Sequence, residues 1–433
     1  MNPYDVKRWN RFCRLAALVW ILALTVSYRT YWPQDQDSGQ YYMGGLVARL
    51  GEWNALYPIP HPGNPYNAGG RVGSSMNPEY RRLAFAQGVG DANRFIQPPP
   101  IALVFVPLSW LPFRGAQWIW FLLMALCCWG VAVQAGRFFE LALGHPSRTS
   151  GVLTILVATS PLVYRVIFLG QISPLVALLL GAAVLGLLKD RTLGIAATLA
   201  SATLMKYVGL SLLPLLIAMS RWREAVWLGA MLCSVMLVAV GVMGSAPFRV
   251  FVNDIAPTLG RSDVWPGNQA LYAFLLRSTG QEGLVLPPGL ELGVRVLQGA
   301  VLLVISVLVF RRGRAFWSEP PNVFAGAAAL LLWTLIFSPL FWEHYVIYLC
   351  PFWGWLAWEA RQTRARLLMV ILAIGLGWAP YAVFLRSYVG EPMTSHMLWS
   401  SMIMLGLACR RLTQAVPVAG YAPQGRMLPG TPR

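Results

Sequence analysis

Uncharged apolar runs recur along this chain and alternate with short polar segments. The runs cover residues 15–28, 101–113, 115–136, 151–164, 166–188, 192–220 (interrupted only by Lys206), 225–248, 296–310, 323–342, 345–358, 367–385 and 397–409. A helix needs roughly 20 apolar residues to cross a bilayer, so the shorter runs must include flanking residues or lie within protein. The pattern predicts an all-α polytopic membrane protein, a bundle of about 12 transmembrane helices.

Two long polar segments interrupt this pattern, at about 33–100 and 249–295. Within the first, two amphipathic pieces near 41–56 and 79–88 predict helices that lie on the membrane surface. The run 15–28 follows a basic start without a small-residue cleavage site and predicts an uncleaved first helix. We therefore expect a cytoplasmic N-terminus (1–14), a single transmembrane domain (15–412) and a disordered cytoplasmic tail (413–433).

Composition excludes a soluble globular protein. Of the 433 residues, 57% are hydrophobic and only 12% are charged, about half the charged fraction of a typical soluble domain. The formal net charge is +17, and the basic residues cluster between apolar runs, which is typical of cytoplasmic loops rather than of nucleic-acid binding.

The basic clusters orient the chain. Arginines at 221–223, 311–314, 361–366 and 410–411 predict the cytoplasmic side, so both long polar segments are expected outside. The cluster at 189–191 falls on the outer side against this rule, and the pairing of helices between 98 and 220 stays open. We expect a multi-pass protein of the inner (plasma) membrane in contact with membrane lipids; the sequence does not predict its oligomeric state.

An acid close to the outer membrane surface is the first candidate for chemistry. Asp37 follows an aromatic segment that exits the membrane and precedes Tyr41 and Tyr42, so a carboxylate there could act as general base on an acceptor hydroxyl. Asp35 is the competing candidate. The other acids of this segment, Glu52, Glu79 and Asp91, are better interpreted as solvated loop residues.

Lys206 is the second candidate, because a lysine within an apolar run is costly to insert into a bilayer. It either snorkels to the interface or faces the bundle interior, where it could hold a phosphate. Arg165, between two apolar runs, has the same two interpretations with a weaker claim.

Glu343 and His344 stand side by side between two apolar runs, in a chain with four histidines. They form either a turn at the interface or a contact to phosphate or sugar. A metal site is not favoured, because the sequence has no HxxxH and no CxxC spacing, and its six cysteines lie in or beside apolar runs. A divalent metal is possible, but we expect no cofactor.

The chain has no Walker A loop, no GxGxxG after a strand and no nucleophile elbow, so a lipid-borne substrate fits better than a soluble nucleotide. A transporter or lipid flippase without transfer chemistry is the alternative, although the two halves show no convincing internal repeat. A structural membrane subunit would not need Asp37 and Glu343 on the same face.

Several motifs together resemble glycosyltransferase family 87, a group of GT-C enzymes that use polyprenyl-phosphate sugars and include mannosyltransferases. The motifs occur in the family's order over about 15–385: DSGQYY at 37–42, FIQPP at 95–99, the prolines of 107–112, GQIS at 170–173, Lys206, Asn268-Gln269, and SPLFWEH at 338–344. The sequence departs from the family pattern at Gln97, Ser173, Val208-Gly209 and Tyr345.

The resemblance implies a GT-C-like fold and an inverting transfer of a sugar, with mannose the first expectation, to a lipid or glycan acceptor on the extracytoplasmic face. It implies that Asp37 is the general base. It also implies that the donor or its phosphate is bound by Lys206, Glu343, His344, Gln171, Asn268 and Gln269.

Overall fold

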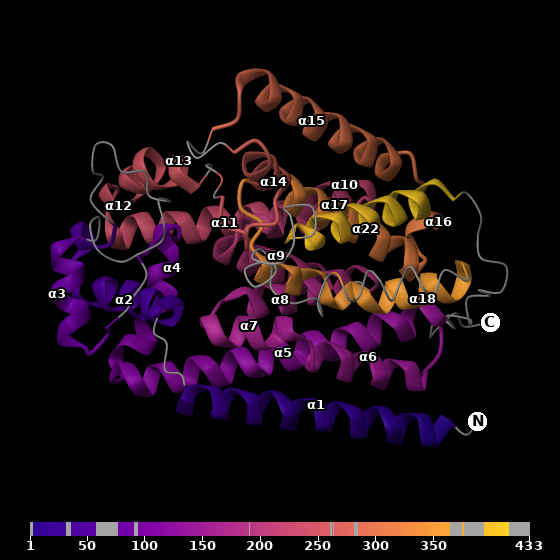
Figure 1. Cartoon of the computed structure of the whole chain (residues 1–433), viewed down its shortest axis with the longest axis horizontal. Helices are drawn as coiled ribbons and strands as arrows, with labels where there is room; N and C mark the ends of the chain where they lie inside the picture. The colour runs from indigo at the N-terminus through magenta and orange to yellow at the C-terminus, as the bar shows by residue number, and fades with distance from the viewer. Residues whose placement is uncertain are drawn as a thin grey trace, which may run out of the picture.

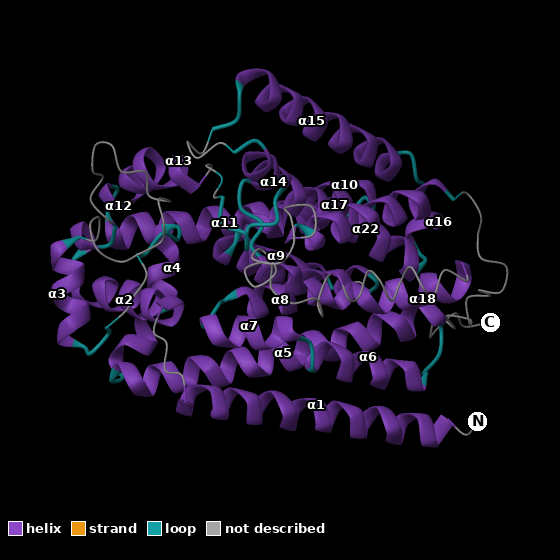
Figure 2. Cartoon of the chain, in the orientation of Figure 1, coloured by secondary structure: helices purple, strands orange, loops and turns teal. Residues whose placement is uncertain are grey.

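The computed structural model describes residues 3–31, 36–57, 77–90, 94–189, 191–259, 262, 264–280, 285–363, 375 and 394–414. Helices joined by short loops make up this part of the chain (Figure 2), and its one isolated β-bridge joins Asn268 to Trp342. Asp35, most of the loop 386–396 and nearly all of the predicted tail lie outside the described residues.

The helices follow one another in this order. They are α1 (Pro3–Tyr31), α2 (Gln36–Leu50), α3 (Pro78–Ala86), α4 (Pro99–Val104), α5 (Phe113–Leu143), α6 (Arg148–Ala158), α7 (Pro161–Leu169), α8 (Ser173–Leu187), α9 (Thr192–Met205), α10 (Leu213–Ala218), α11 (Trp222–Met243), α12 (Ala246–Val250), α13 (Ala256–Leu259), α14 (Leu271–Ser278), α15 (Pro288–Phe310), α16 (Arg314–Trp317), α17 (Pro320–Phe337), α18 (Trp353–Thr363) and α22 (His396–Thr413). Short 3₁₀ helices cover Trp53–Ala55, Val106–Trp110, Tyr207–Leu212 and Glu343–Phe352, and a π-helix covers Phe251–Ile255.

Five of the described helices are long and apolar enough to cross a membrane: α1, α5, α11, α15 and α17. The pair α6 and α7 would form a sixth span, bent by 44° at the break between them. Three shorter apolar pieces, α8, α9 and Tyr207–Ala218, contribute to the same bundle. The structure confirms an all-α polytopic membrane protein, while the count of about 12 helices stays a prediction.

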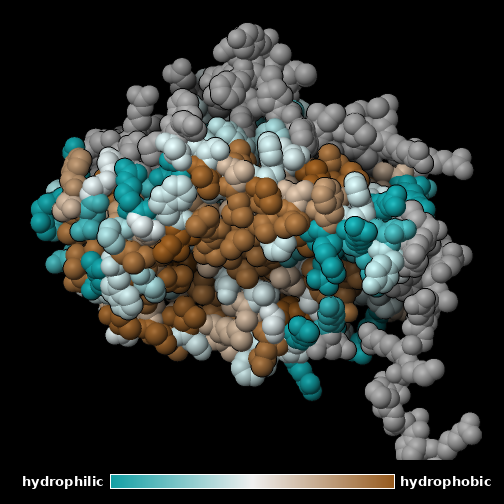
Figure 3. Space-filling view, turned by 90° about the horizontal axis from the view of Figure 1, so that it is seen from below, coloured by the Kyte–Doolittle hydropathy of each residue, from teal (hydrophilic) through white to brown (hydrophobic). Residues whose placement is uncertain are grey.

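The long helices run roughly along the longest axis of the molecule (Figure 1). Helix α1 packs on α5 and α6, α5 packs on α8 and α18, and α17 packs on α22. On the face that carries α1, an apolar band lies between two hydrophilic ends (Figure 3). Exposed apolar side chains of α1, among them Leu15, Val19 and Trp20, point outward, as expected for a surface that meets lipid.

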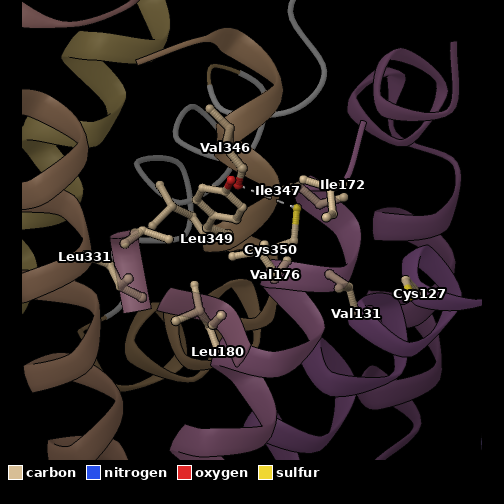
Figure 4. Packing of buried hydrophobic residues seen from close by; sticks show 14 of the residues in the cluster. Cys127, Val131, Ile172, Val176, Leu180, Leu331, Val346, Ile347, Leu349 and Cys350 are labelled. Carbon is tan, nitrogen blue, oxygen red and sulfur yellow. Dashed lines mark hydrogen bonds between the residues drawn. The ribbon is translucent and has the colours of Figure 1, made fainter. Parts of the chain in front are cut away.

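The 3₁₀ helix Glu343–Phe352 lies in the centre of the bundle. Figure 4 shows Val346, Ile347, Leu349 and Cys350 of this helix packed among side chains of α5, α8 and α17. The next helix, α18, packs closely on α5, and Gly354 allows this approach because a Cβ atom there would lie 2.0 Å from the backbone oxygen of Ala135. The packing of the 3₁₀ helix in the bundle holds its first two residues, Glu343 and His344, inside the protein.

The structure corrects two sequence-based predictions. The helix predicted near 41–56 is present as α2, but its predicted position on the membrane surface is wrong, because every residue of α2 from 37 to 48 is buried within the protein. The run 101–113 is not a span but a short helix followed by the 3₁₀ helix Val106–Trp110. The described part of the second polar segment, 249–295, is largely helical, and its last residues begin α15. Hydropathy alone does not reveal which other parts of the protein cover the segment 41–56, or where a helix breaks within 101–113.

Candidate active site

Asp37 lies in the first turn of α2 and is only 7% exposed. Its Oδ1 accepts a hydrogen bond from Gln40 Nε2 at 3.2 Å, and its Oδ2 accepts one from Gln171 Nε2 at 2.5 Å. The amide N–H groups and the dipole at a helix N-terminus favour a carboxylate. The carboxyl group of Asp37 is therefore held inside the protein in a position suited to its ionised form.

Gln171 reaches Asp37 because α7 ends in a tight turn at Gly170. Gly170 has a left-handed φ of +65°, and a Cβ atom there would lie 3.2 Å from Cβ of Ser38, so a glycine lets the turn approach α2 closely. Trp120 Nε1 donates to the Gly170 carbonyl at 2.9 Å and fixes the turn.

Tyr41 lies one helical turn after Asp37, with its ring stacked on Phe105 at 4.9 Å. Burial raises the pKa of Tyr41 well above its usual range, and the negative charge of Asp37 adds to the effect. Tyr41 is therefore within electrostatic reach of Asp37. Tyr42 points elsewhere, since its hydroxyl donates to the Leu111 carbonyl at 3.0 Å.

Lys206 stands at a helix break rather than in the middle of a helix. Its backbone is extended (φ −152°, ψ 123°) between α9 and the 3₁₀ helix Tyr207–Leu212. The half-buried ammonium donates to Tyr345 Oη at 2.8 Å and borders a cavity of about 30 Å³. Tyr207, Ser338 and Tyr348 also line the cavity, so three further side chains with hydroxyl groups share it with Lys206.

A chain of aromatic and hydroxyl contacts joins Lys206 to the Asp37 side of the site. The ring of Tyr345 stacks on Tyr348 at 5.5 Å, and Tyr348 Oη donates to Ser173 Oγ at 3.3 Å. Ser173 begins α8, two residues after Gln171, which bonds to Asp37. The structure thus links the acid and the lysine, 169 positions apart in the chain, through four intervening residues in one interior region.

Glu343 and His344 are both buried, at 2% and 6% exposed, so the alternative of an exposed turn does not apply. Glu343 Oε1 accepts from Arg165 Nε at 2.9 Å, and burial raises the pKa of Glu343, while Arg165 opposes this shift. Burial, followed by the charges of Lys206 and Arg165, holds the pKa of His344 well below its usual 6.5. The His344 imidazole is therefore neutral, and its buried Nε2 has no hydrogen-bond partner among the described residues.

Asn268 and Gln269 fasten the second polar segment onto residues 339–343. Asn268 Oδ1 accepts from the Phe341 amide at 2.8 Å, and its Nδ2 donates to the Pro339 carbonyl at 3.0 Å. The Gln269 amide N–H donates to the Phe341 carbonyl at 2.6 Å. Because the Asn268 amide is engaged within the protein, this geometry favours a structural role, and the donor contacts predicted for this pair stay predictions.

Six predicted site residues therefore meet in one interior region: Asp37, Tyr41, Gln171, Lys206, Glu343 and His344. Arg165, the weaker sequence candidate, joins them through Glu343. Tyr348 and Gln40 were not predicted, because an isolated tyrosine or glutamine gives no signal of its neighbours. Among the described residues, no group of three His, Cys, Asp or Glu side chains could hold a metal ion, and the prediction of no cofactor stays a prediction.

Comparison with the models of known protein families gives a match. The family model of glycosyltransferase family 87 matches residues 95–339, more than half of the chain. The match includes Arg165, Gln171, Lys206 and Asn268, while Asp37 lies before it and Glu343-His344 just after it. No curated protein matches the chain.

Proposed function

The chain belongs to glycosyltransferase family 87, and from this premise we propose that it transfers a sugar from a polyprenyl-phosphate donor to a hydroxyl group of a lipid or glycan acceptor. The observation that carries the proposal is a series of contacts that links a buried carboxylate, Asp37, to the cation Lys206. The residues of this series are Gln171, Ser173, Tyr348 and Tyr345. Such a transfer needs a base for the acceptor hydroxyl and a cation for the leaving phosphate, and both groups are present in one interior region.

In the proposed reaction, Asp37 accepts the proton of the acceptor hydroxyl as its oxygen attacks the anomeric carbon. The bond from that carbon to the phosphate oxygen breaks, and its electron pair stays on the leaving polyprenyl phosphate. A single displacement inverts the anomeric configuration. The phosphate gains negative charge as the bond breaks, and a fixed ammonium such as Lys206 stabilises this charge more in the transition state than in the ground state.

An apolar groove supports a donor that is carried on a lipid. The groove has a volume of about 390 Å³ and lies between α15, α17 and α22, with Leu297, Val301 and Met402 among its lining residues. The groove reaches Ile336 and Phe337 at the end of α17. The neighbouring residues Leu335 and Ser338 line the Lys206 cavity. A prenyl chain in the groove would place its phosphate near this turn.

The distribution of charge supports an extracytoplasmic site in the plasma membrane. The basic start of α1 and the arginines that end α22 lie at the same end of the molecule, while α2, α3 and α12 lie at the opposite end (Figure 1). Basic residues favour the cytoplasmic side, so the end that carries α2, and hence Asp37, faces outward in this orientation.

The test is a transfer assay with the full chain in lipid nanodiscs. Radiolabelled polyprenyl-phosphate mannose, the first donor suggested by the family resemblance, is mixed with a membrane lipid extract as the source of acceptors. Mass spectrometry of lipid-linked and surface glycans from cells with and without the protein identifies the product. We expect a new glycan that is lost in Asp37→Asn; movement of the donor across the bilayer without any glycosidic product would favour a flippase instead.

A further inference from the structure

Two cations flank the three successive residues 343–345, of which the first two are buried. Arg165 Nε donates to Glu343 Oε1 at 2.9 Å, and Lys206 Nζ donates to Tyr345 Oη at 2.8 Å. Between these contacts lies His344, which is 6% exposed and whose Nε2 has no partner among the described residues. Burial lowers the pKa of His344, and the charges of Lys206 and Arg165 add to this effect, in keeping with their contacts to the residues on either side of it.

Arg165 and Glu343 are unequal partners in this region. The side chain of Glu343 is 2% exposed, whereas that of Arg165 is 25% exposed, so Arg165 is the partner with access to a ligand. Glu343 is fixed further by its own backbone, whose N–H donates to the Gly267 carbonyl at 2.8 Å. The guanidinium is a planar fork that suits phosphate as well as carboxylate.

We propose that Arg165 is a second phosphate-binding cation of this site, and that Glu343 holds it in position until the leaving phosphate gains its second negative charge. The proposal rests on the function proposed above and names the charge state that the site prefers. A sugar-linked phosphodiester carries one negative charge, which Lys206 can balance. The released prenyl phosphate is a monoester with a second pKa of about 6, so it carries close to two charges at neutral pH.

The pairing with Glu343 makes the contribution of Arg165 depend on that second charge. While the phosphate is a monoanion, the carboxylate balances the guanidinium, and Arg165 adds little to the binding of the donor. Once the phosphate is a dianion, it competes with Glu343 for the guanidinium. Arg165 thereby stabilises the late transition state and the product more than the donor, which is the difference that accelerates a reaction.

Direct binding to the full-length protein in nanodiscs tests this selectivity without turnover. The probes are a short-chain prenyl phosphate, which is a dianion, and its methyl ester, which is a monoanion of nearly the same shape. We expect Arg165→Gln to weaken binding of the phosphate by about 10- to 100-fold, the range for one hydrogen bond between charged groups, and binding of the ester by less than about threefold. Arg165→Lys should restore part of the loss.

Glu343→Gln provides the opposite perturbation. Without the competing carboxylate, Arg165 should bind the prenyl phosphate several-fold more tightly than in the parent protein. A purely structural ion pair predicts instead that Arg165→Gln and Glu343→Gln weaken both probes alike, and this result would overturn the proposal. Arg295→Gln, which removes an exposed arginine paired with Glu291 within α15, is the matched control and should change neither affinity.

A single variant that leaves one charge of the buried pair could fold poorly. The double variant Arg165→Gln/Glu343→Gln avoids this, because two amides can still bond to each other. We expect it to retain the monodisperse elution of the parent and the weak phosphate binding of Arg165→Gln; if it binds the phosphate as the parent does, the proposal is wrong. Selective phosphate binding without any sugar transfer would refute the proposed function and leave the role of Arg165 intact.

Discussion

Replacing Asp37 with asparagine tests the proposed base with the smallest possible change in side-chain shape. General-base catalysis contributes about 10²- to 10⁴-fold to a rate, which corresponds to about 3–5 kcal/mol of activation free energy. We therefore expect Asp37→Asn to lower kcat by at least about a hundredfold. The assay is single-turnover transfer of radiolabelled sugar in nanodiscs, because it separates chemistry from product release.

The same variant should fold normally, for reasons visible around the carboxyl group. Asp37 accepts from Gln40 and Gln171, and an asparagine would present one amide nitrogen to one of these donors. The Gln171 Oε1 has no partner among the described residues, so rotation of this amide restores a hydrogen bond. The change from charged to neutral hydrogen bonds costs about 1 kcal/mol of folding free energy, which should leave the amount of protein in the membrane unchanged.

Two further variants locate the effect. Glu52→Gln removes an exposed acid from the same polar segment and should not alter transfer. Gln171→Leu removes the hydrogen bond to Asp37 Oδ2, and it should add nothing to the loss in the Asp37→Asn background if Gln171 acts only through Asp37. If Asp37→Asn keeps more than about a tenth of the parent rate, the carboxylate is not the base and the assignment fails.

Substitutions at three other positions probe the rest of the site. Lys206→Ala should raise the KM for the donor and lower kcat by about 10- to 100-fold, with Lys206→Arg partly active, because the phosphate loses a charged donor; equal activity of the two variants would contradict this. His344→Gln should lower kcat but leave the pH–rate profile unmoved between about pH 6 and 8, since a depressed pKa keeps the imidazole neutral there; a shifted acid limb would show that His344 titrates. Asn268→Ala should destabilise the protein by about 2–4 kcal/mol, because the Phe341 amide and the Pro339 carbonyl lose their buried partner; a raised donor KM with an unchanged melting temperature would indicate a ligand contact instead.

The fold class could be predicted from the sequence because an apolar run of span length has few alternatives. The places where helices break could not. Lys206 lies in a run that reads as continuous from 192 to 220, yet its backbone is extended, and this break turns the side chain toward Tyr345. Hydropathy averages over many residues and carries no information on a single backbone conformation.

The site was predictable where a residue type is costly in its surroundings. Charged or polar residues are unusual beside apolar runs, and three such places stand out: a carboxylate before an aromatic pair, a lysine in an apolar run, and an adjacent acid and histidine. The structure brings these residues, Asp37, Lys206, Glu343 and His344, into one interior region. The hydrogen bonds of Asn268 to the backbone of residues 339 and 341 were not predictable, because an amide bonds equally well to a sugar or to a backbone. Its distant partner, Phe341, is set by the tertiary fold.

The short helix α7, which is bent away from α6, places residues beside both Glu343 and Asp37. Helix α7 directs Arg165 toward Glu343 and ends at Gly170, so that Gln171 reaches Asp37 only six positions later. Irregular backbone at membrane depth is tolerated only where protein covers it, and the turn at 170–172 is buried. Helix ends inside the bundle therefore provide what uninterrupted spans cannot, namely polar side chains from distant parts of the chain that converge on one covered region. The residues proposed for sugar transfer lie at or beside such ends because only there can a carboxylate, a cation and an imidazole all leave the apolar helix faces and meet.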